Sequence, residues 1–257
     1  MTLVMVASAC SSDVDFTDLE FRGDTALYKG ELYTGPAIEH FPEGTVKTEA
    51  SFNNGLYHGS YKTWYENGNP EFTGQWENGK RVGLWNRYHE NGNPYIEGSF
   101  VDGKREGQWK YWHENNQLEF QGEWKNDRQH GIWKGWYPGG QLKSEVTWNE
   151  GVQEGPEVKY FENGQIKGEG VFRNGMQTGV WKWYHENGNM QALENWKDGM
   201  AHGLVTNYHE NGVKEREGTY DMNEKTGTFK IWDESGQLVK KEIYKDGKMV
   251  QEITVQN

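Results

Sequence analysis

Aromatic and polar residues alternate in short runs along most of the chain, and each run ends at a turn-forming sequence. The stretch from Gly59 to Gly83 shows the pattern, with Ser-Tyr-Lys-Thr-Trp-Tyr, then Glu-Asn-Gly, then Pro-Glu-Phe-Thr-Gly-Gln-Trp, then Glu-Asn-Gly. Alternation bounded by turn formers predicts β-strands. The stretch therefore predicts a β-hairpin, followed by a second turn that leads into the next hairpin.

A glycine recurs every 24 residues without an insertion, at Gly35, Gly59, Gly83, Gly107, Gly131, Gly155, Gly179, Gly203 and Gly227. We count positions from this opening glycine, which is position 1. A fixed period of roughly 20–50 residues indicates a repeat architecture. The connections are too short for parallel crossovers, so consecutive strands must be antiparallel. We predict an all-β fold, an elongated, twisted, single-layer antiparallel meander of repeated β-hairpins with a 24-residue period.

Aromatic residues recur at two positions of the first strand, which we expect to run from about position 2 to position 7. Position 3 is aromatic in Tyr61, Trp85, Trp109, Trp133, Trp181 and Phe229, but is Ala37, Glu157 and Val205 elsewhere. Position 6 is aromatic in every unit except the first, which has His40. Residues shared by all units are explained by the architecture. We therefore expect a specific function to depend on the positions at which the units differ.

The two turns and the second strand carry the remaining signals. Asn and Gly both tolerate the positive φ that a tight hairpin turn requires, and the pair recurs in both turns. The second strand carries Gly at position 16 and an aromatic residue at position 18, as in Gly74 and Trp76. These two positions share a face because side chains alternate along a strand. A glycine there leaves room for an aromatic ring from a neighbouring strand.

The repeated motif resembles the MORN repeat in its bacterial variant form. The residues that carry the resemblance are Gly-x-Trp-x-x-Tyr-x-Glu-Asn-Gly, followed by Gly-x-Phe/Trp-x-x-Gly, over about residues 25–250. The resemblance implies an elongated array of antiparallel hairpins that acts as a non-catalytic scaffold for protein binding. It also implies phospholipid binding for some members and an antitoxin-like label for bacterial ones. No separate DNA-binding or toxin-neutralising motif stands outside the repeats.

Composition and charge narrow the possible partners. Hydrophobic residues make up 33% of the chain and aromatic residues 14%, so the apolar burial must come from Trp, Tyr and Phe. The formal net charge of −12 repels phosphate backbones and anionic lipid surfaces, which argues against nucleic acid as a partner. The chain has no apolar run of 18 residues, which argues against a spanning helix. Its single cysteine, Cys10, excludes an internal disulfide and a cysteine-based metal site.

The first residues are short, apolar and end in small residues before Cys10, and they resemble the end of a bacterial lipoprotein signal peptide. The resemblance implies lipidation of Cys10 and a place in the bacterial cell envelope, on the outer membrane because Ser11 follows. A cytoplasmic chain with an incidental cysteine is the alternative. The expected organisation is a partial signal at 1–10, a tether at 11–24, an N-terminal half-repeat cap at 25–34, eight repeats at 35–226, and a final repeat with a C-terminal cap at 227–257.

Four histidines at position 7 form the sharpest polar cluster, and each is followed by Glu: His89, His113, His185 and His209. Equivalent residues of neighbouring hairpins lie two strand spacings apart, about 9–10 Å. Donor atoms on one zinc ion must lie about 3–4 Å from each other, given metal–ligand distances of about 2 Å. We therefore expect a solvated polar ladder, with no metal and no cofactor.

Exposed aromatic residues are the remaining candidates for a binding surface, since a single-layer sheet has two faces and some rings must hold the units together. The possible surface comprises Trp85, Trp109, Trp112, Trp133, Trp136, Trp181, Tyr184, His89, His113, His185 and His209. No nucleophile–base pair, phosphate loop or paired carboxylates is evident, so we expect no catalysis. The leading hypothesis is a protein-binding scaffold at the cell envelope. Glycan or peptidoglycan binding and an antitoxin-like role are the alternatives.

Overall fold

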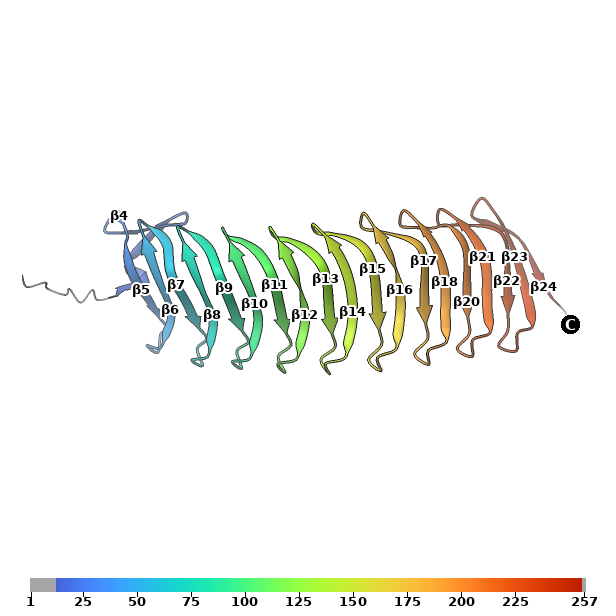
Figure 1. Ribbon diagram of the computed structural model, residues 1–257, viewed down its shortest axis with the longest axis horizontal. Coiled ribbons are helices and arrows are strands. Elements are labelled where there is room, and N and C mark those ends of the chain that lie inside the picture. The colour runs from blue at the N-terminus through green and yellow to red at the C-terminus, as the bar shows by residue number, and fades with distance from the viewer. Residues whose placement is uncertain (1–12, 256–257) are drawn as a thin grey trace, which may run out of the picture. The chain divides into compact units, whose positions relative to one another are not determined.

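The computed structural model describes residues 13–255, which form β-strands with one short 3-10 helix. Contacts within the chain divide it into two compact units. Unit 1 extends to Gly107 and includes Glu114–Asn116, and unit 2 comprises Gln108–His113 and the chain from Gln117 onward. In each unit the strands follow one another in chain order (Figure 1). The predicted cysteine modification at Cys10 lies outside the described residues.

Unit 1 begins with a short N-terminal section and continues with long strands. The N-terminal section contains β1 (Val14–Asp15), η1 (Phe16–Asp18), β2 (Leu19–Arg22), β3 (Thr25–Tyr28) and β4 (Glu31–Leu32). The long strands are β5 (Gly35–His40), β6 (Val46–Asn53), β7 (Leu56–Trp64), β8 (Pro70–Glu77), β9 (Lys80–Tyr88) and β10 (Pro94–Val101). The boundary between the units falls within β11 (Lys104–Trp112).

Unit 2 continues the same alternation of strands and turns. Its strands are β12 (Leu118–Lys125), β13 (Arg128–Trp136), β14 (Leu142–Asn149), β15 (Val152–Tyr160), β16 (Ile166–Arg173), β17 (Met176–Tyr184), β18 (Met190–Lys197), β19 (Met200–Ala201), β20 (Gly203–Tyr208), β21 (Lys214–Asp221), β22 (Glu224–Trp232), β23 (Leu238–Lys245) and β24 (Lys248–Thr254).

Consecutive long strands pair antiparallel in both units, which confirms the predicted open meander of hairpins with a 24-residue period. Within one hairpin, β13 pairs with β14 through partners such as Trp133 and Val146, and β15 pairs with β16 through Glu157 and Gly170. β1 is an exception, because it pairs parallel to β5.

The opening glycine lies inside the first strand and not at the end of a turn, so the predicted strand bounds are wrong. β9 begins at Lys80, three residues before Gly83. Gly83 has a φ of 64°, and the register between β8 and β9 shifts beside it. A positive φ at a register shift is the mark of a β-bulge, which bends the strand and which glycine adopts without steric cost. The recurring glycine therefore places one bend in every hairpin.

The two turns use their Asn-Gly pairs differently. In the closing turn, Asn78 and Gly79 both have positive φ, 49° and 76°, as expected for a two-residue hairpin turn. In the other connection the positive φ falls on Gly68, at 84°, while the side chain of Asn67 accepts a hydrogen bond from the backbone N–H of Asn69. The expectation that both residues need a positive φ is therefore wrong for this connection, where asparagine acts through its side chain.

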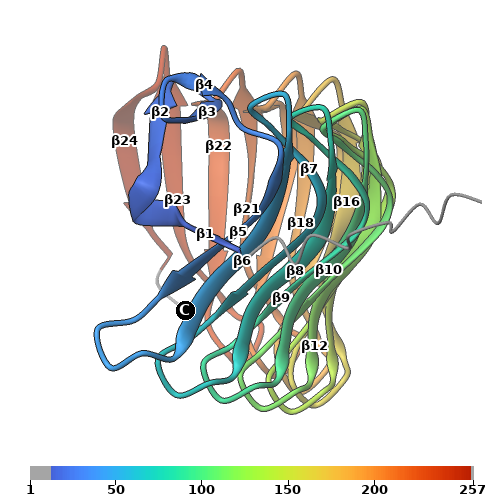
Figure 2. The same cartoon turned by 90° about the vertical axis from the view of Figure 1, so that its left-hand side faces the viewer.

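The N-terminal section covers the start of the array, and the described part of the expected tether, from Asp13 to Asp24, forms strands and a 3-10 turn within it. β2, β3 and β4 form a small antiparallel sheet beside the first curved strands (Figure 2). Leu19, Ala26 and Tyr33 from this section form a buried cluster with Ala50 and Phe52. The backbone N–H of Ala26 also donates to the carbonyl of Gly55, at 2.7 Å. The cluster removes one end of the aromatic face from solvent.

Candidate functional site

The face that carries positions 3, 16 and 18, here called the stripe face, is packed by aromatic rings that lie on glycine backbones. A Cβ atom added to Gly122 would lie 2.2 Å from the Trp133 ring, and one added to Gly170 would lie 2.1 Å from the Trp181 ring. The same arrangement joins Gly74 to Trp85 and Gly218 to Phe229. Each ring lies over the glycine of the preceding hairpin, as the glycine pattern predicts. We call each such contact a step between hairpins.

Four tryptophans of the predicted binding surface are used in this packing. Trp85, Trp109, Trp133 and Trp181 are 5%, 6%, 8% and 1% exposed. Edge-to-face contacts with position 18 rings hold them further, as between Trp133 and Trp124, with centroids 5.4 Å apart. These four side chains are therefore not accessible to a partner. The part of the predicted surface that stays accessible lies elsewhere.

Two steps of unit 2 lack both the glycine and the aromatic ring. The other steps of unit 2 have a glycine and an aromatic ring. Val146 and Glu157 replace them in the first interrupted step, and Glu194 and Val205 replace them in the second. Glu157 is buried, at 5% exposure. The stripe is thus interrupted twice within one unit.

The carboxylates on the stripe face are paired inside the chain. Glu157 Oε2 lies 3.2 Å from Lys159 Nζ, although this ion pair lacks hydrogen-bond geometry. Glu194 Oε2 accepts hydrogen bonds from the indole N–H groups of Trp183 and Trp196, at 3.0 and 3.1 Å. A buried charge is costly unless it is paired or hydrogen-bonded, so these partners make the two interruptions tolerable.

The opposite face carries positions 2, 4, 6, 15 and 17, and its aliphatic side chains are exposed in unit 2. Position 2 forms a row along β13, β15, β17 and β20, here called the aliphatic row, which comprises Ile132, Pro156, Val180 and Leu204. Ile132, Val180 and Leu204 are 57%, 49% and 46% exposed. A shallow hollow of about 250 Å³ lies in this row between Pro156, Val158, Val171 and Val180.

Ion pairs and half-buried aromatic residues run beside the aliphatic row. Lys182 Nζ lies 3.0 Å from Glu169 Oε1, which also accepts a hydrogen bond from the Tyr184 hydroxyl. Lys134 and Glu145 form the same arrangement, at 2.7 Å, and the hydrogen bond from Lys134 holds the pKa of Glu145 below its usual value. Trp112 and Trp136 of the predicted surface are half-buried in this position 6 row.

The edge with the Glu-Asn-Gly turns explains the position 7 residues. Nε2 of His185 lies 2.9 Å from the Tyr208 carbonyl oxygen, and His113 and His209 make the equivalent contact at 3.3 and 3.0 Å. Because a carbonyl only accepts, Nε2 must carry the proton. The Tyr65 hydroxyl donates to the Tyr88 carbonyl in the same way, at 2.8 Å. The position 7 side chains therefore make part-buried hydrogen bonds and do not form the expected solvated ladder. Both His and Tyr can donate this bond, which explains why either residue occurs at position 7.

The remaining position 7 histidine, His89, also makes a ring contact. The His89 ring packs on Tyr95, with centroids 4.6 Å apart. His89 also lines a shallow hollow of about 330 Å³ with Glu90 and Glu114. Among residues 13–255, no group of three or more His, Cys, Asp and Glu side chains could hold a metal ion.

Asparagine side chains form a second set of links along the same edge. The Asn187 and Asn189 side-chain amides both donate to the Glu210 carbonyl, at 2.8 and 2.7 Å. Asn67 and Asn69 bind the Glu90 carbonyl in the same way. The Glu-Asn-Gly-Asn sequence that recurs along the chain therefore serves the contact between hairpins. The alternation pattern alone could not have revealed it, because the bonded residues lie 21 and 23 positions apart.

A family comparison agrees with this geometry. A model described as MORN repeat variant matches eight consecutive segments, residues 57–78, 81–102, 105–126, 129–150, 153–174, 177–198, 201–222 and 225–246. Together they span more than half of the chain. The chain belongs to the MORN repeat variant family. Its members are repeat scaffolds, and each matched segment of this MORN protein begins with the strand that carries the opening-glycine bulge.

Two further comparisons add little to this MORN assignment. No curated protein matches the chain. One similar solved structure is titled "Crystal Structure of TcdB2-TccC3-Cdc42", with 11% identity and a TM-score of 0.20. The match covers 85% of this chain and only 13% of the other, so this chain spans a small part of that protein's length.

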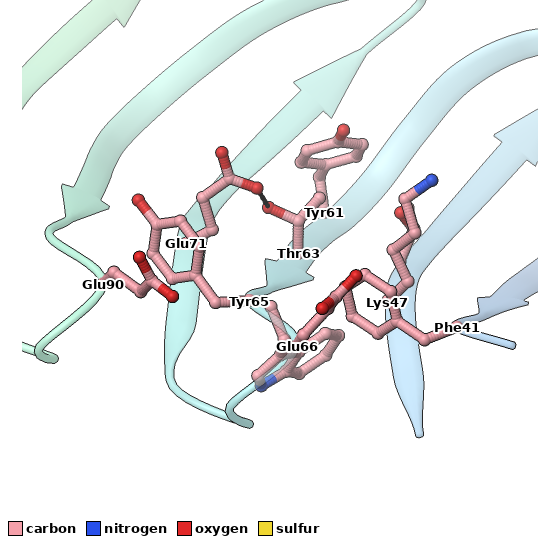
Figure 3. Close-up of a pocket in the computed structure, with 10 residues that line it drawn as sticks. Phe41, Lys47, Tyr61, Thr63, Tyr65, Glu66, Glu71 and Glu90 are labelled. Carbon is pink, nitrogen blue, oxygen red and sulfur yellow. Dashed lines mark hydrogen bonds between the residues drawn. The ribbon is translucent and has the colours of Figure 1, made fainter. Parts of the chain in front are cut away.

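Two hollows open between MORN hairpins near the Glu-Asn-Gly turns. The first, in unit 1, has a volume of about 490 Å³ and is lined by residues that include Lys47, Tyr61, Thr63 and Glu71 (Figure 3). Glu71 accepts a hydrogen bond from the Thr63 hydroxyl in this hollow, at 3.3 Å. The second, in unit 2, has about 350 Å³ and is lined by Trp183, His185, Gln191, Ala192, Glu194, Asn207, Tyr208 and Glu215. The sequence pattern predicted neither hollow.

Within the part of the chain that the structure describes, no helix is long and apolar enough to cross a membrane.

Proposed function

We propose that this MORN protein is a non-catalytic scaffold whose ligand is another protein. The observation that carries the proposal is the aliphatic row of unit 2, in which Ile132, Val180 and Leu204 are about half exposed on a regular strand surface. Contiguous exposed apolar side chains bordered by polar residues mark protein interaction sites, and Pro156, Val158, Val171 and Val180 form such a group around the hollow in this row. Lys182 and Glu169 supply such a polar border.

The contrast between the two faces supports this assignment. Tryptophans of the stripe face are covered by neighbouring hairpins, as for Trp133 and Trp181, so they contribute packing and not a surface. The aliphatic row has no such role, since Ile132 lies beside polar Thr147 in the register of β13 and β14. A partner that covered this row would bury apolar area and would break few polar contacts of these side chains.

The test changes the row without touching the stripe. The double variant Ile132→Asp and Val180→Asp places two charges in the row, and its matched control is Val152→Asp with Met176→Asp. The control residues are 45% and 41% exposed and lie at the closing-turn edge. We expect a protein that co-purifies from the native cell to be lost with the row variant, with a Kd raised roughly tenfold or more, and retained with the control.

Two results would contradict the proposal. One is the absence of any saturable protein partner of the native chain. The other is equal binding by the row variant and the control, with both folds checked by circular dichroism. Binding of an oligosaccharide that both variants keep would favour the glycan alternative through the position 6 aromatic residues.

The place of this scaffold in the cell is a separate proposal. We infer a lipid anchor on Cys10 at the bacterial envelope from the apolar, small-residue sequence that precedes it. Radiolabelled palmitate should enter the native protein and not a Cys10→Ser variant. An unlabelled native protein in the cytoplasmic fraction would instead support the antitoxin-like alternative.

A further inference from the structure

The hollow of unit 2 shares several of its lining positions with the hollow of unit 1. Gln191 occupies the place of Lys47, which is position 13 of the hairpin, and Glu215 occupies the place of Glu71 in the next hairpin. Glu194 stands where unit 1 has Ala50. The unit 2 hollow therefore has two carboxylates and no lysine or arginine among its lining residues, whereas Lys47 shares the unit 1 hollow with Glu66, Glu71 and Glu90.

Unit 1 shows how this MORN framework accommodates an ammonium group. Lys47 lines the hollow, and its Nζ lies 2.8 Å from Glu39 Oε1 (Figure 3 shows Lys47 beside Tyr61). The hydrogen bond to Glu39 raises the pKa of Lys47, and the charge of Glu71 adds to the effect. The ammonium group at this edge of the unit 1 hollow is thus held mainly by Glu39, which lies outside the lining, with a smaller contribution from Glu71 inside it.

Unit 2 keeps its carboxylates oriented but without a cation among the lining residues. Glu194 Oε2 is fixed by two indole N–H groups, and its Oε1 atom makes no hydrogen bond with another residue of the described range 13–255. Glu215 has neither a hydrogen bond nor an ion pair with another described residue, and it is exposed. Trp183 and Tyr208 supply apolar walls next to these carboxylates.

The cations on neighbouring strands are already engaged. Lys214 Nζ binds Glu217 Oε2 at 2.5 Å, and Arg216 binds Glu242 at 2.8 Å. Lys159 Nζ pairs with Glu157 and lies 5.8 Å from the centroid of the Trp183 ring. The one histidine of the lining, His185, already uses Nε2 on the Tyr208 carbonyl. None of these groups therefore neutralises Glu215.

We propose that the unit 2 hollow, between Glu194 and Glu215, binds a lysine or arginine side chain of a protein partner. The inference deepens the proposed function and rests on it, since it specifies the partner's chemistry as a basic segment. The aliphatic stem of such a side chain packs on Trp183 and Tyr208, while its charged end meets the two carboxylates. The net charge of −12 attracts basic segments to the chain as a whole, and the hollow gives one basic side chain a defined place.

The test uses the full chain and a fluorescent peptide of alternating threonine and lysine, compared with the same peptide carrying acetylated lysines. Gln191→Lys restores the cation that unit 1 has at this position, and we expect it to weaken binding of the lysine peptide roughly tenfold or more, as measured by anisotropy. Glu194→Gln with Glu215→Gln should weaken binding by a similar factor. The Kd of the native chain for the acetylated peptide should be at least as high as the Kd of either variant for the lysine peptide.

The matched control removes the same number of charges outside the hollow. Glu162→Gln with Glu234→Gln changes two exposed turn residues of unit 2 that do not line it, and we expect less than a twofold change in Kd. Equal losses of affinity for the lysine peptide in the control and the hollow variants would show that overall charge alone attracts the peptide. That result would overturn the inference. Failure of the native chain to bind the lysine peptide would overturn it as well.

The proposed function is tested separately by the aliphatic-row variant. If the cellular partner is lost with the row variant and kept with Gln191→Lys, the scaffold function stands and the hollow assignment fails. If no protein partner exists at all, the proposed function fails, whatever the peptide does. Gln191 is exposed, so its substitution leaves the packed stripe unchanged, and near-ultraviolet circular dichroism checks this directly.

Discussion

A step that keeps its glycine and a step that has lost it hold neighbouring hairpins together by different means. Between Gly122 and Trp133, an indole ring lies on bare backbone, and Trp133 is 8% exposed. Between Val146 and Glu157, an aliphatic side chain occupies the place of the glycine, and a buried carboxylate pairs with Lys159. The comparison shows that the glycine and the ring form one unit of packing, so that one cannot change without the other.

The second interrupted step follows the same rule with another partner. Glu194 replaces the glycine, Val205 replaces the ring, and the indoles of Trp183 and Trp196 satisfy the carboxylate. Both interruptions thus exchange dispersion contacts for charge-assisted hydrogen bonds or an ion pair, which stabilise only when the partners are in place. The second interruption also adjoins the unit 2 hollow, because Glu194 is one of its lining residues.

The largest expected effect comes from closing the space under a ring in a kept step. Gly170→Ala would place a Cβ 2.1 Å from the Trp181 ring, which is 1% exposed and cannot move away freely. We expect the free energy of unfolding to fall by about 3 kcal/mol, at the upper end of the range for overpacked cores. Urea denaturation followed by tryptophan fluorescence measures the change.

A matched glycine separates this clash from a general effect of glycine replacement. Gly139→Ala would meet only the flexible side chain of exposed Gln141, so we expect a change of less than about 0.5 kcal/mol. Similar losses in both variants would contradict the ring-on-glycine account.

The next prediction concerns a double variant that gives an interrupted step the glycine and the ring of the other steps. Val146→Gly removes an aliphatic side chain, and Glu157→Trp alone forces an indole against Val146, so each single change should destabilise the chain. Together they rebuild the arrangement of Gly122 and Trp133, and we expect a favourable coupling energy of about 2 kcal/mol. A double-mutant cycle by urea denaturation gives this number, and additive effects would mean that the two positions are not one packing unit.

The sequence was sufficient to predict the framework because its signals are local and repeated. Alternation gave the hairpins, and the glycine at position 16 indicated an overlying ring, as Gly74 and Trp85 show. Which residues share a face within one hairpin follows directly from the alternation of side chains along a strand. The position of the opening-glycine bulge was missed, because Gly83 reads equally well as the end of a turn.

The candidate site was less predictable, because it depends on contacts between hairpins. Trp181 and Trp136 look alike in sequence, but the first is buried under its neighbours and the second is half-buried on the other face. The sequence predicts a solvated His185, whereas in the structure Nε2 of its ring lies 2.9 Å from the Tyr208 carbonyl oxygen. The burial of the N-terminal Leu19 also depends on residues far along the chain, which no local pattern reports.

The smallest effect concerns the edge bonds, which both interrupted steps retain. The Tyr137 hydroxyl donates to the Tyr160 carbonyl across the step of Val146 and Glu157, at 2.9 Å, and Tyr65 makes the same bond across a kept step. Phe161 occupies this position naturally, so Tyr137→Phe and Tyr65→Phe fit without strain, and each should cost about 1 kcal/mol.

Hydrogen exchange distinguishes these two variants better than global unfolding does. Without a ring on glycine to hold the hairpins together, loss of the Tyr137 bond should speed exchange of the β14 and β15 amides more than loss of the Tyr65 bond speeds exchange in β8 and β9. The reverse order would mean that the ion pair of Glu157 and Lys159 holds its step as firmly as the Trp85 ring holds its own. The interrupted steps would then be equal in strength to the kept ones and different only in chemistry.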